Sequence, residues 1–158
     1  MPTTSAGILL YRLGNAPDVL IAHMGGPFWA GKDAGAWSIP KGEYDEGDEP
    51  ALDAATREFR EELGIDPPDG PYAELGTFAY SSGKRVTVFV SDGSALSLDG
   101  VVFGEFELEW PPRSGRMASF PEVDRVEWMT MDAARERLVK GQRPAIDALA
   151  EHLAAAGA

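Results

Sequence analysis

The chain has 158 residues, 44% of them hydrophobic, and its 26 acidic residues outnumber its 14 lysines and arginines to give a formal net charge of −12. This length and composition predict one globular domain over residues 1–158, and the absence of cysteine excludes disulfides, thiolate metal sites and thiol catalysis. No apolar run reaches the roughly 18–20 residues of a membrane span, and the N-terminal seven residues lack the basic segment of a secretory signal. Binding to a phosphate backbone needs clustered basic residues, which this acidic composition argues against. We therefore expect a cytoplasmic protein without a membrane or stable nucleic-acid partner.

The N-terminal third predicts two strands and a glycine-rich loop. Apolar runs at residues 5–11 and 19–23 flank a turn at 14–18 and are typical of a strand pair. Residues 25–35 are rich in glycine and predict a loop, and residues 37–39 form a brief extended segment that Pro40 stops.

Residues 49–63 predict the clearest helix, because Leu52, Ala55, Phe59 and Leu63 recur at steps of three and four. Asp48 is placed to cap the start of this helix, Pro50 suits its first turn and Gly64 suits its end.

The remaining elements are expected in alternating order along the chain. They are strands at 74–80, 85–90 and 101–109, a loop at 111–119, a strand at 125–129, and helices at 132–139 and 145–155. Strands on both sides of an internal helix, followed by C-terminal helices, predict an α/β (α+β) fold with a mixed sheet between helical layers.

The negative charge is concentrated in one segment. Residues 43–69 hold eleven of the acidic residues and only two basic ones. On the predicted helix, Glu58, Glu61 and Glu62 lie on one arc beside the apolar stripe, while Arg57 and Arg60 point in another direction. A charge run taken alone is usually a solvated helix face. A divalent cation is the alternative, because Mg²⁺ prefers carboxylate oxygens, waters and substrate phosphates as ligands.

The wider pattern favours the cation. Gly42, Glu49 and the run Arg57-Glu58-Phe59-Arg60-Glu61-Glu62-Leu63-Gly64-Ile65 resemble the signature of the Nudix hydrolases. The loop between Gly42 and Glu49 is one residue longer than in the family pattern. Residues 37–42, 106–116 and 120–128 extend the resemblance, which is strongest to bacterial MutT-like proteins.

The resemblance implies a Nudix-type α/β/α sandwich that hydrolyses a diphosphate linkage in a nucleoside di- or triphosphate derivative with Mg²⁺, for which Mn²⁺ can substitute. Glu58 and Glu62, one turn apart, are then the best direct metal ligands, completed by the backbone carbonyl of Lys41 or Gly42. Glu61 binds a second metal or the attacking water, and Arg57 orients a glutamate.

Several roles stay open at this point. Glu122, six residues before Trp128, is the candidate general base or additional metal ligand, with Glu105, Glu107 and Glu109 as alternatives because they alternate along a predicted strand. Candidate phosphate contacts are Lys41, Lys84 and Arg113. Candidate base-stacking rings are Phe28, Trp37 and Tyr80, although aromatic residues at such positions usually serve packing.

The substrate class is also open. The subgroup likeness favours a nucleoside triphosphate, whereas the Glu122–Trp128 spacing favours a dinucleoside polyphosphate such as diadenosine tetraphosphate. A nucleotide-binding module without catalysis is less favoured, because such modules typically lose the glutamates that this chain keeps at positions 58, 61 and 62.

Overall fold

The computed structural model describes residues 3–157. Met1 and Pro2, part of the N-terminal segment inspected for a signal, and Ala158 lie outside the described residues. In chain order the elements are β1 (Thr4–Arg12), β2 (Asp18–Met24), β3 (Trp37–Ser38), β4 (Lys41–Glu43), α1 (Ala51–Leu63), β5 (Ala73–Ala79), β6 (Arg85–Asp92), β7 (Glu105–Glu109), β8 (Met117–Pro121), β9 (Val123–Thr130), α2 (Met131–Arg137), the 3₁₀ turn η1 (Lys140–Gln142) and α3 (Arg143–Gly157).

The main sheet is mixed and divides at β1. Its strands follow the order β3-β2-β1-β6-β5, with β4 also paired to β1 and β9 to β2. β1 and β6 run parallel over their whole length, whereas β1 pairs with β2 only from Leu10 to Arg12 and with β4 from Ser5 to Gly7. β4 therefore takes the place beside β1 that β2 vacates, and this places Lys41 and Gly42 next to α1.

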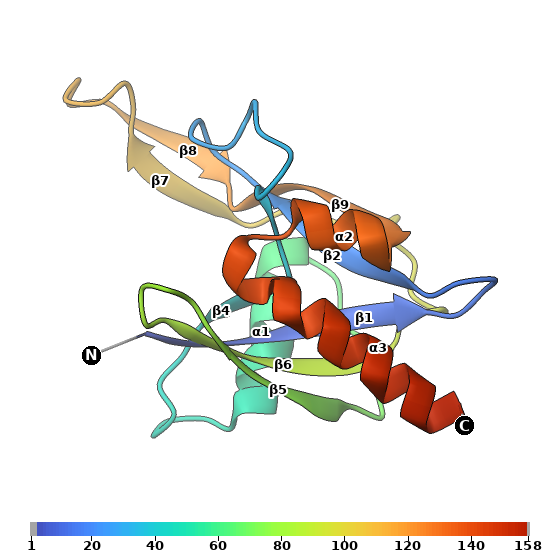
Figure 1. Ribbon diagram of the computed structural model, residues 1–158. Coiled ribbons are helices and arrows are strands. Elements are labelled where there is room, and N and C mark those ends of the chain that lie inside the picture. The colour runs from blue at the N-terminus through green and yellow to red at the C-terminus, as the bar shows by residue number, and fades with distance from the viewer. Residues whose placement is uncertain (1–2, 158) are drawn as a thin grey trace.

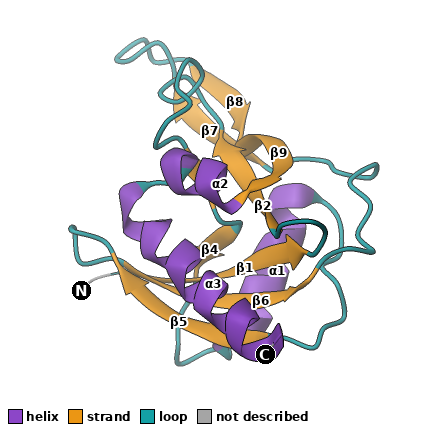
Figure 2. Cartoon of the chain, turned by 45° about the vertical axis from the view of Figure 1, so that its right-hand side comes forward, coloured by secondary structure: helices purple, strands orange, loops and turns teal. Residues whose placement is uncertain are grey.

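Helices cover both faces of this sheet (Figure 1, Figure 2). On one face Phe59 and Leu63 of α1 are fully buried against the strands, and on the other Ile146 and Leu149 of α3 are buried together with residues of α2. This arrangement confirms the predicted mixed sheet between helical layers. Within residues 3–157 no helix is both long and apolar enough to cross a bilayer.

β7 and β8 form a separate two-stranded sheet that extends away from the helices (Figure 1). Glu105, Glu107 and Glu109 are exposed on one face of β7, and Phe106 and Leu108 are half-buried on the other. The strand at 117–121 was missed from the sequence, which predicted a loop at 111–119, because the turn-forming residues before it obscure its short alternating pattern.

The segment before β7 and the start of α1 also differ from the prediction. Residues 101–104 do not extend β7, because their amides bond the last carbonyls of α1: Val102 donates to Leu63 (2.9 Å) and Gly104 to Glu62 (3.2 Å). α1 begins at Ala51 with Pro50 at the N-cap and no side-chain cap, so Asp48 does not cap it. Gly64 ends α1 in the left-handed conformation (φ 68°), as predicted.

Candidate functional site

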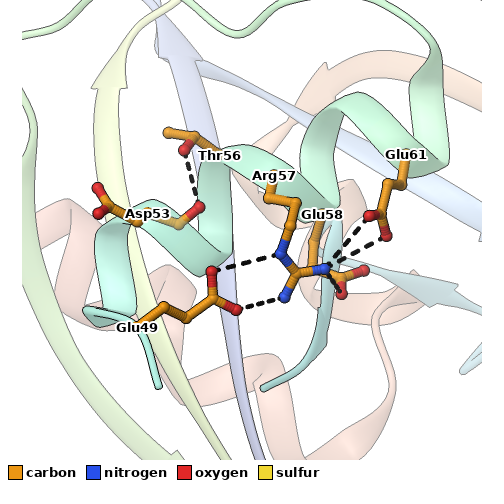
Figure 3. Close-up of polar contacts among 6 residues, drawn as sticks. All are labelled: Glu49, Asp53, Thr56, Arg57, Glu58 and Glu61. Carbon is orange, nitrogen blue, oxygen red and sulfur yellow. Dashed lines mark hydrogen bonds and ion pairs between the residues drawn. The ribbon is translucent and has the colours of Figure 1, made fainter. Parts of the chain in front are cut away.

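Arg57 links the carboxylates of the acidic segment (Figure 3). Its Nη2 lies 2.6 Å from Glu49 Oε1, and its Nη1 lies 2.8 Å from Glu58 Oε1 and 3.3 Å from Glu61 Oε1. Arg57 leaves the helix in a different direction from the glutamates, but its long side chain reaches back to Glu58 and Glu61. The additional loop residue leaves Glu49 within reach of the guanidinium, so Arg57 holds three carboxylates in one cluster.

Glu58 lies against the backbone of β4. A Cβ on Gly42 would overlap the Glu58 carboxylate, so only glycine allows this approach. Burial raises the pKa of Glu58, Arg57 opposes this rise, and the Glu61 carboxylate adds to it. Glu58 is therefore held between the Arg57 guanidinium on its own helix and the Gly42 backbone.

Glu62, one turn after Glu58, is the most buried of the three helix glutamates. Burial, opposed by the Lys41 ammonium and reinforced by the carboxylates of Glu122 and Glu58, raises the pKa of Glu62 to about 8. Among the described residues, no hydrogen-bond partner reaches its Oε2 atom, which is completely buried. Since buried polar atoms are nearly always satisfied, we expect a water or an ion to contact this atom.

Glu122 comes to the same place from the junction of β8 and β9. Its amide donates to the Gly104 carbonyl (2.7 Å), and Gly104 in turn donates to the Glu62 carbonyl. Its own carbonyl accepts from Gly25 (2.9 Å). Burial raises the pKa of Glu122, and the Glu61 carboxylate contributes to the rise. The backbone thus fixes Glu122 beside the C-terminal half of α1.

A cavity of about 340 Å³ lies beside Glu62 and Glu122, whereas Glu58 and Glu61 are not among its lining residues. Its lining comes from β2, β3, β4, β9, the glycine-rich loop, α1 and the β7–β8 hairpin. The lining residues are Met24, Gly25, Trp29, Ser38, Lys41, Glu62, Phe106, Glu122 and Val123. The cavity therefore brings together two carboxylates and one candidate phosphate contact from three separate parts of the sequence.

Other candidates lie elsewhere. Lys84 is in the β5–β6 turn, where its carbonyl accepts from Tyr80, and Arg113 is in the β7–β8 turn. Neither side chain lines the cavity. The alternative bases Glu105, Glu107 and Glu109 are exposed on the outer face of β7 and do not line it either.

The aromatic candidates also lie outside the cavity. Trp37 is 1% exposed within the core, the Tyr80 hydroxyl accepts a 2.7 Å hydrogen bond from Gln142 Nε2, and Phe28 packs edge-on against Trp110 at the hairpin. The rings that line the cavity are instead Trp29 and Phe106, which the sequence did not single out. The alternation of apolar residues with glutamates over residues 105–109 is the sequence signal that could have identified Phe106.

The donors present fit a hard divalent cation. The unpartnered Glu62 oxygen and the neighbouring Glu58 and Glu61 carboxylates are oxygen ligands of the kind that Mg²⁺ prefers. Within residues 3–157, however, no three acidic or histidine side chains are already grouped tightly enough to hold a metal. Glu58 and Glu61 are instead both paired with the Arg57 guanidinium.

Comparisons of the sequence with known proteins give one family. A family model described as NUDIX domain matches residues 1–149. An uncharacterised 17.7 kDa protein of the e–segB intergenic region of enterobacteria phage T4 is 39% identical over 90 residues, which cover 56% of this chain and 58% of the phage protein. The match therefore spans less than two thirds of that relative's length.

Similar solved structures agree in fold. An Ap4A hydrolase from C. elegans, in a binary complex, has a TM-score of 0.65 at 20% identity, over 96% of this chain and 98% of that chain. The NUDIX domain of Shewanella oneidensis NrtR, complexed with ADP ribose, has a TM-score of 0.63 at 17% identity, over 97% of this chain and 89% of that chain. These likenesses confirm the α/β/α sandwich that the sequence predicted.

Proposed function

This chain belongs to the NUDIX family, and we propose that it is a Mg²⁺-dependent, MutT-like pyrophosphohydrolase acting on a nucleoside di- or triphosphate derivative. The observation that carries this proposal is the unpartnered, buried Glu62 oxygen in a cavity that also holds Glu122 and Lys41. An acidic cavity of this kind can receive a diphosphate only if cations bridge the two sets of negative charges.

The α1 glutamates and β4 would hold the metal. Glu58 and Glu62 are the direct ligands, with the Gly42 backbone carbonyl as a third and Glu61 for a second cation or the attacking water. Bound Mg²⁺ would neutralise the non-bridging phosphate oxygens and help position a water. Arg57 acts as a positioning residue, because it contacts Glu58 and Glu61 rather than the cavity.

Glu122 accepts the proton of the attacking water. It lines the cavity, whereas the carboxylates of β7 do not. Its pKa is raised above the ordinary value, which is the direction that favours a general base near neutral pH. The water oxygen bonds to one phosphorus, the bridging P–O bond breaks, and the second phosphate leaves with the bridging oxygen. Lys41 is the basic residue among those that line the cavity, and its ammonium group is placed to contact a phosphate there.

The test is a panel of nucleotides incubated with Mg²⁺ or Mn²⁺, with products separated by chromatography. Release of a nucleoside monophosphate and pyrophosphate, or of a nucleoside diphosphate and phosphate, supports the proposal and identifies the cleaved bond. Full recovery of every nucleotide with both metals would contradict it.

A dinucleoside polyphosphate is the second candidate substrate. The spacing between Glu122 and Trp128 is similar to that in enzymes acting on such compounds, and the fold is shared with the C. elegans Ap4A hydrolase. Diadenosine tetraphosphate therefore belongs in the panel beside the nucleoside triphosphates. Faster turnover of this compound than of any triphosphate would favour the second candidate.

A further inference from the structure

The cavity has an apolar part that the chemistry of the carboxylates does not use. Phe106 and Trp29 line it together with Met24, in the same cavity as Glu62 and Glu122. The cavity therefore presents both groups suited to a cation-bridged phosphate and flat apolar rings. A nucleotide has the same two parts, a charged phosphate chain and a planar base.

Phe106 is held firmly in its position. It pairs with Phe120 across β7 and β8, and the centroids of the two rings lie 6.1 Å apart. On another side the ring lies against Gly26, where a Cβ would come within 3.0 Å of it and where φ is 93°. Because backbone and a second ring fix it, Phe106 offers a preorganised surface to the cavity.

The hairpin and the glycine-rich loop together carry the two cavity rings. A two-stranded hairpin is marginally stable alone, and contacts with residues 26–30 support β7 and β8. Phe28 and Trp110 pack edge to face at 5.5 Å, and the loop and hairpin lie side by side in both views (Figure 1, Figure 2). The next loop residue, Trp29, lines the same cavity as Phe106.

We propose that Phe106, together with Trp29, forms the slot that binds the nucleobase, so that the β7–β8 hairpin determines how tightly this enzyme binds nucleotides. The inference rests on the proposed function, because it assumes that the phosphates of the same nucleotide lie near Glu62 and Lys41. Stacking of a base on an aromatic ring tolerates any base. The slot therefore recognises nucleotides as a class, and it has no need to distinguish between bases.

The test compares Phe106→Ala with Leu108→Ala. Leu108 lies on the same half-buried face of β7 but does not line the cavity, so its variant reports lost hairpin packing alone. With ATP and Mg²⁺, we expect Phe106→Ala to raise KM about 10–100-fold with little change in kcat. We expect Leu108→Ala to stay within about threefold of the wild type in KM.

A second readout does not need turnover. Saturation-transfer NMR with adenosine 5′-monophosphate and Mg²⁺ should show saturation transfer to the base protons in the wild type and in Leu108→Ala. In Phe106→Ala the transfer signal of the base protons should lose most of its intensity. Equal KM values and equal base signals in the Phe106→Ala and Leu108→Ala variants would overturn the slot.

The outcomes separate this inference from the proposed function. A wild type that hydrolyses nucleotides but is indifferent to Phe106→Ala refutes the slot and leaves the function intact. A wild type that binds adenosine 5′-monophosphate through Phe106 but hydrolyses no nucleotide refutes the function and leaves the slot. If the hairpin face instead binds a second copy of this chain, light scattering will show a wild-type dimer that Phe106→Ala and Leu108→Ala both dissociate, and this too overturns the slot.

Discussion

Gly42 lies directly against the carboxylate of Glu58, so closely that a Cβ at position 42 would overlap it. The glycine comes from β4 and the glutamate from α1, and the division of the sheet at β1 places the two elements in contact. A strand backbone therefore limits where the first candidate metal ligand can lie.

Gly42→Ala should lower kcat/KM about 10²-fold, because the new methyl group displaces Glu58 by the order of 1 Å. Steady-state hydrolysis of the best nucleotide at saturating Mg²⁺ measures this. Gly31→Ala is the matched control, since a Cβ there meets nothing within 4 Å. Equal activity of the Gly42→Ala and Gly31→Ala variants would show that the close approach has no functional role.

The metal-free protein should lose stability as the pH rises from about 5 to 8. The pKa of Glu62 is about 8 in the folded chain against an ordinary value of 4.5, so between these values the folded state binds a proton that the unfolded state has released. Stability is therefore greatest at low pH within this window and falls as the pH approaches 8. Thermal unfolding in EDTA across this range measures the effect.

Glu62→Gln should flatten this pH dependence and raise the melting temperature at pH 8, by about 2–4 °C for each kcal/mol recovered. Some slope will remain, because the pKa values of Glu58 and Glu122 are raised as well. Added Mg²⁺ should stabilise the wild type at pH 8 more than it stabilises the variant. If the melting temperatures of the wild type and Glu62→Gln change with pH in the same way, Glu62 is excluded as the source of the pH dependence.

Glu122→Gln should lower kcat by about 10²–10³-fold, because the amide cannot accept the proton of the attacking water. The wild-type rate should fall at acid pH as the carboxylate is protonated, and it should do so above the usual pH range of a glutamate because the pKa of Glu122 is raised. Glu107→Gln, on the exposed outer face of β7, is the control. A near-normal rate in Glu122→Gln combined with a low rate in Glu107→Gln would move the base to the hairpin.

Arg57→Lys should raise the Mg²⁺ concentration needed for half-maximal rate, or lower the rate, about 10–100-fold. A lysine keeps the charge but cannot reach Glu49, Glu58 and Glu61 at once as the guanidinium does. Arg60→Lys is the control on the same helix, because the one ion pair that Arg60 forms within residues 3–157 is with the exposed Asp66. Identical Mg²⁺ titrations of the Arg57→Lys and Arg60→Lys variants would contradict a positioning role for Arg57.

The parts of the site that follow from local patterns could be predicted from the sequence. The spacing of Phe59 and Leu63 established which face of α1 is buried, and the run from Arg57 to Glu62 placed the glutamates beside that face. Gly64 could be identified as the end of the helix because the left-handed backbone conformation at that position favours glycine.

The rest depends on contacts between distant segments. No local pattern shows that residues 102–104 bond the last carbonyls of α1, and this bonding is why the predicted strand at 101–109 is shorter than expected. The position of Phe106 in the cavity likewise depends on β8, which was not predicted, and on the loop that packs against both strands. Lys84 and Arg113 were selected as basic residues close to the predicted site loops, and closeness in sequence does not determine the direction in which a turn extends.

The most direct test of the account is a Mg²⁺ titration of nucleotide hydrolysis by the wild type and Glu62→Gln, with products identified by chromatography and folding verified by circular dichroism. Cation binding by the buried α1 carboxylates predicts saturable, Mg²⁺-dependent cleavage of a diphosphate linkage by the wild type and loss of that cleavage in a folded Glu62→Gln variant. Unchanged Mg²⁺-dependent turnover in the variant would contradict the account.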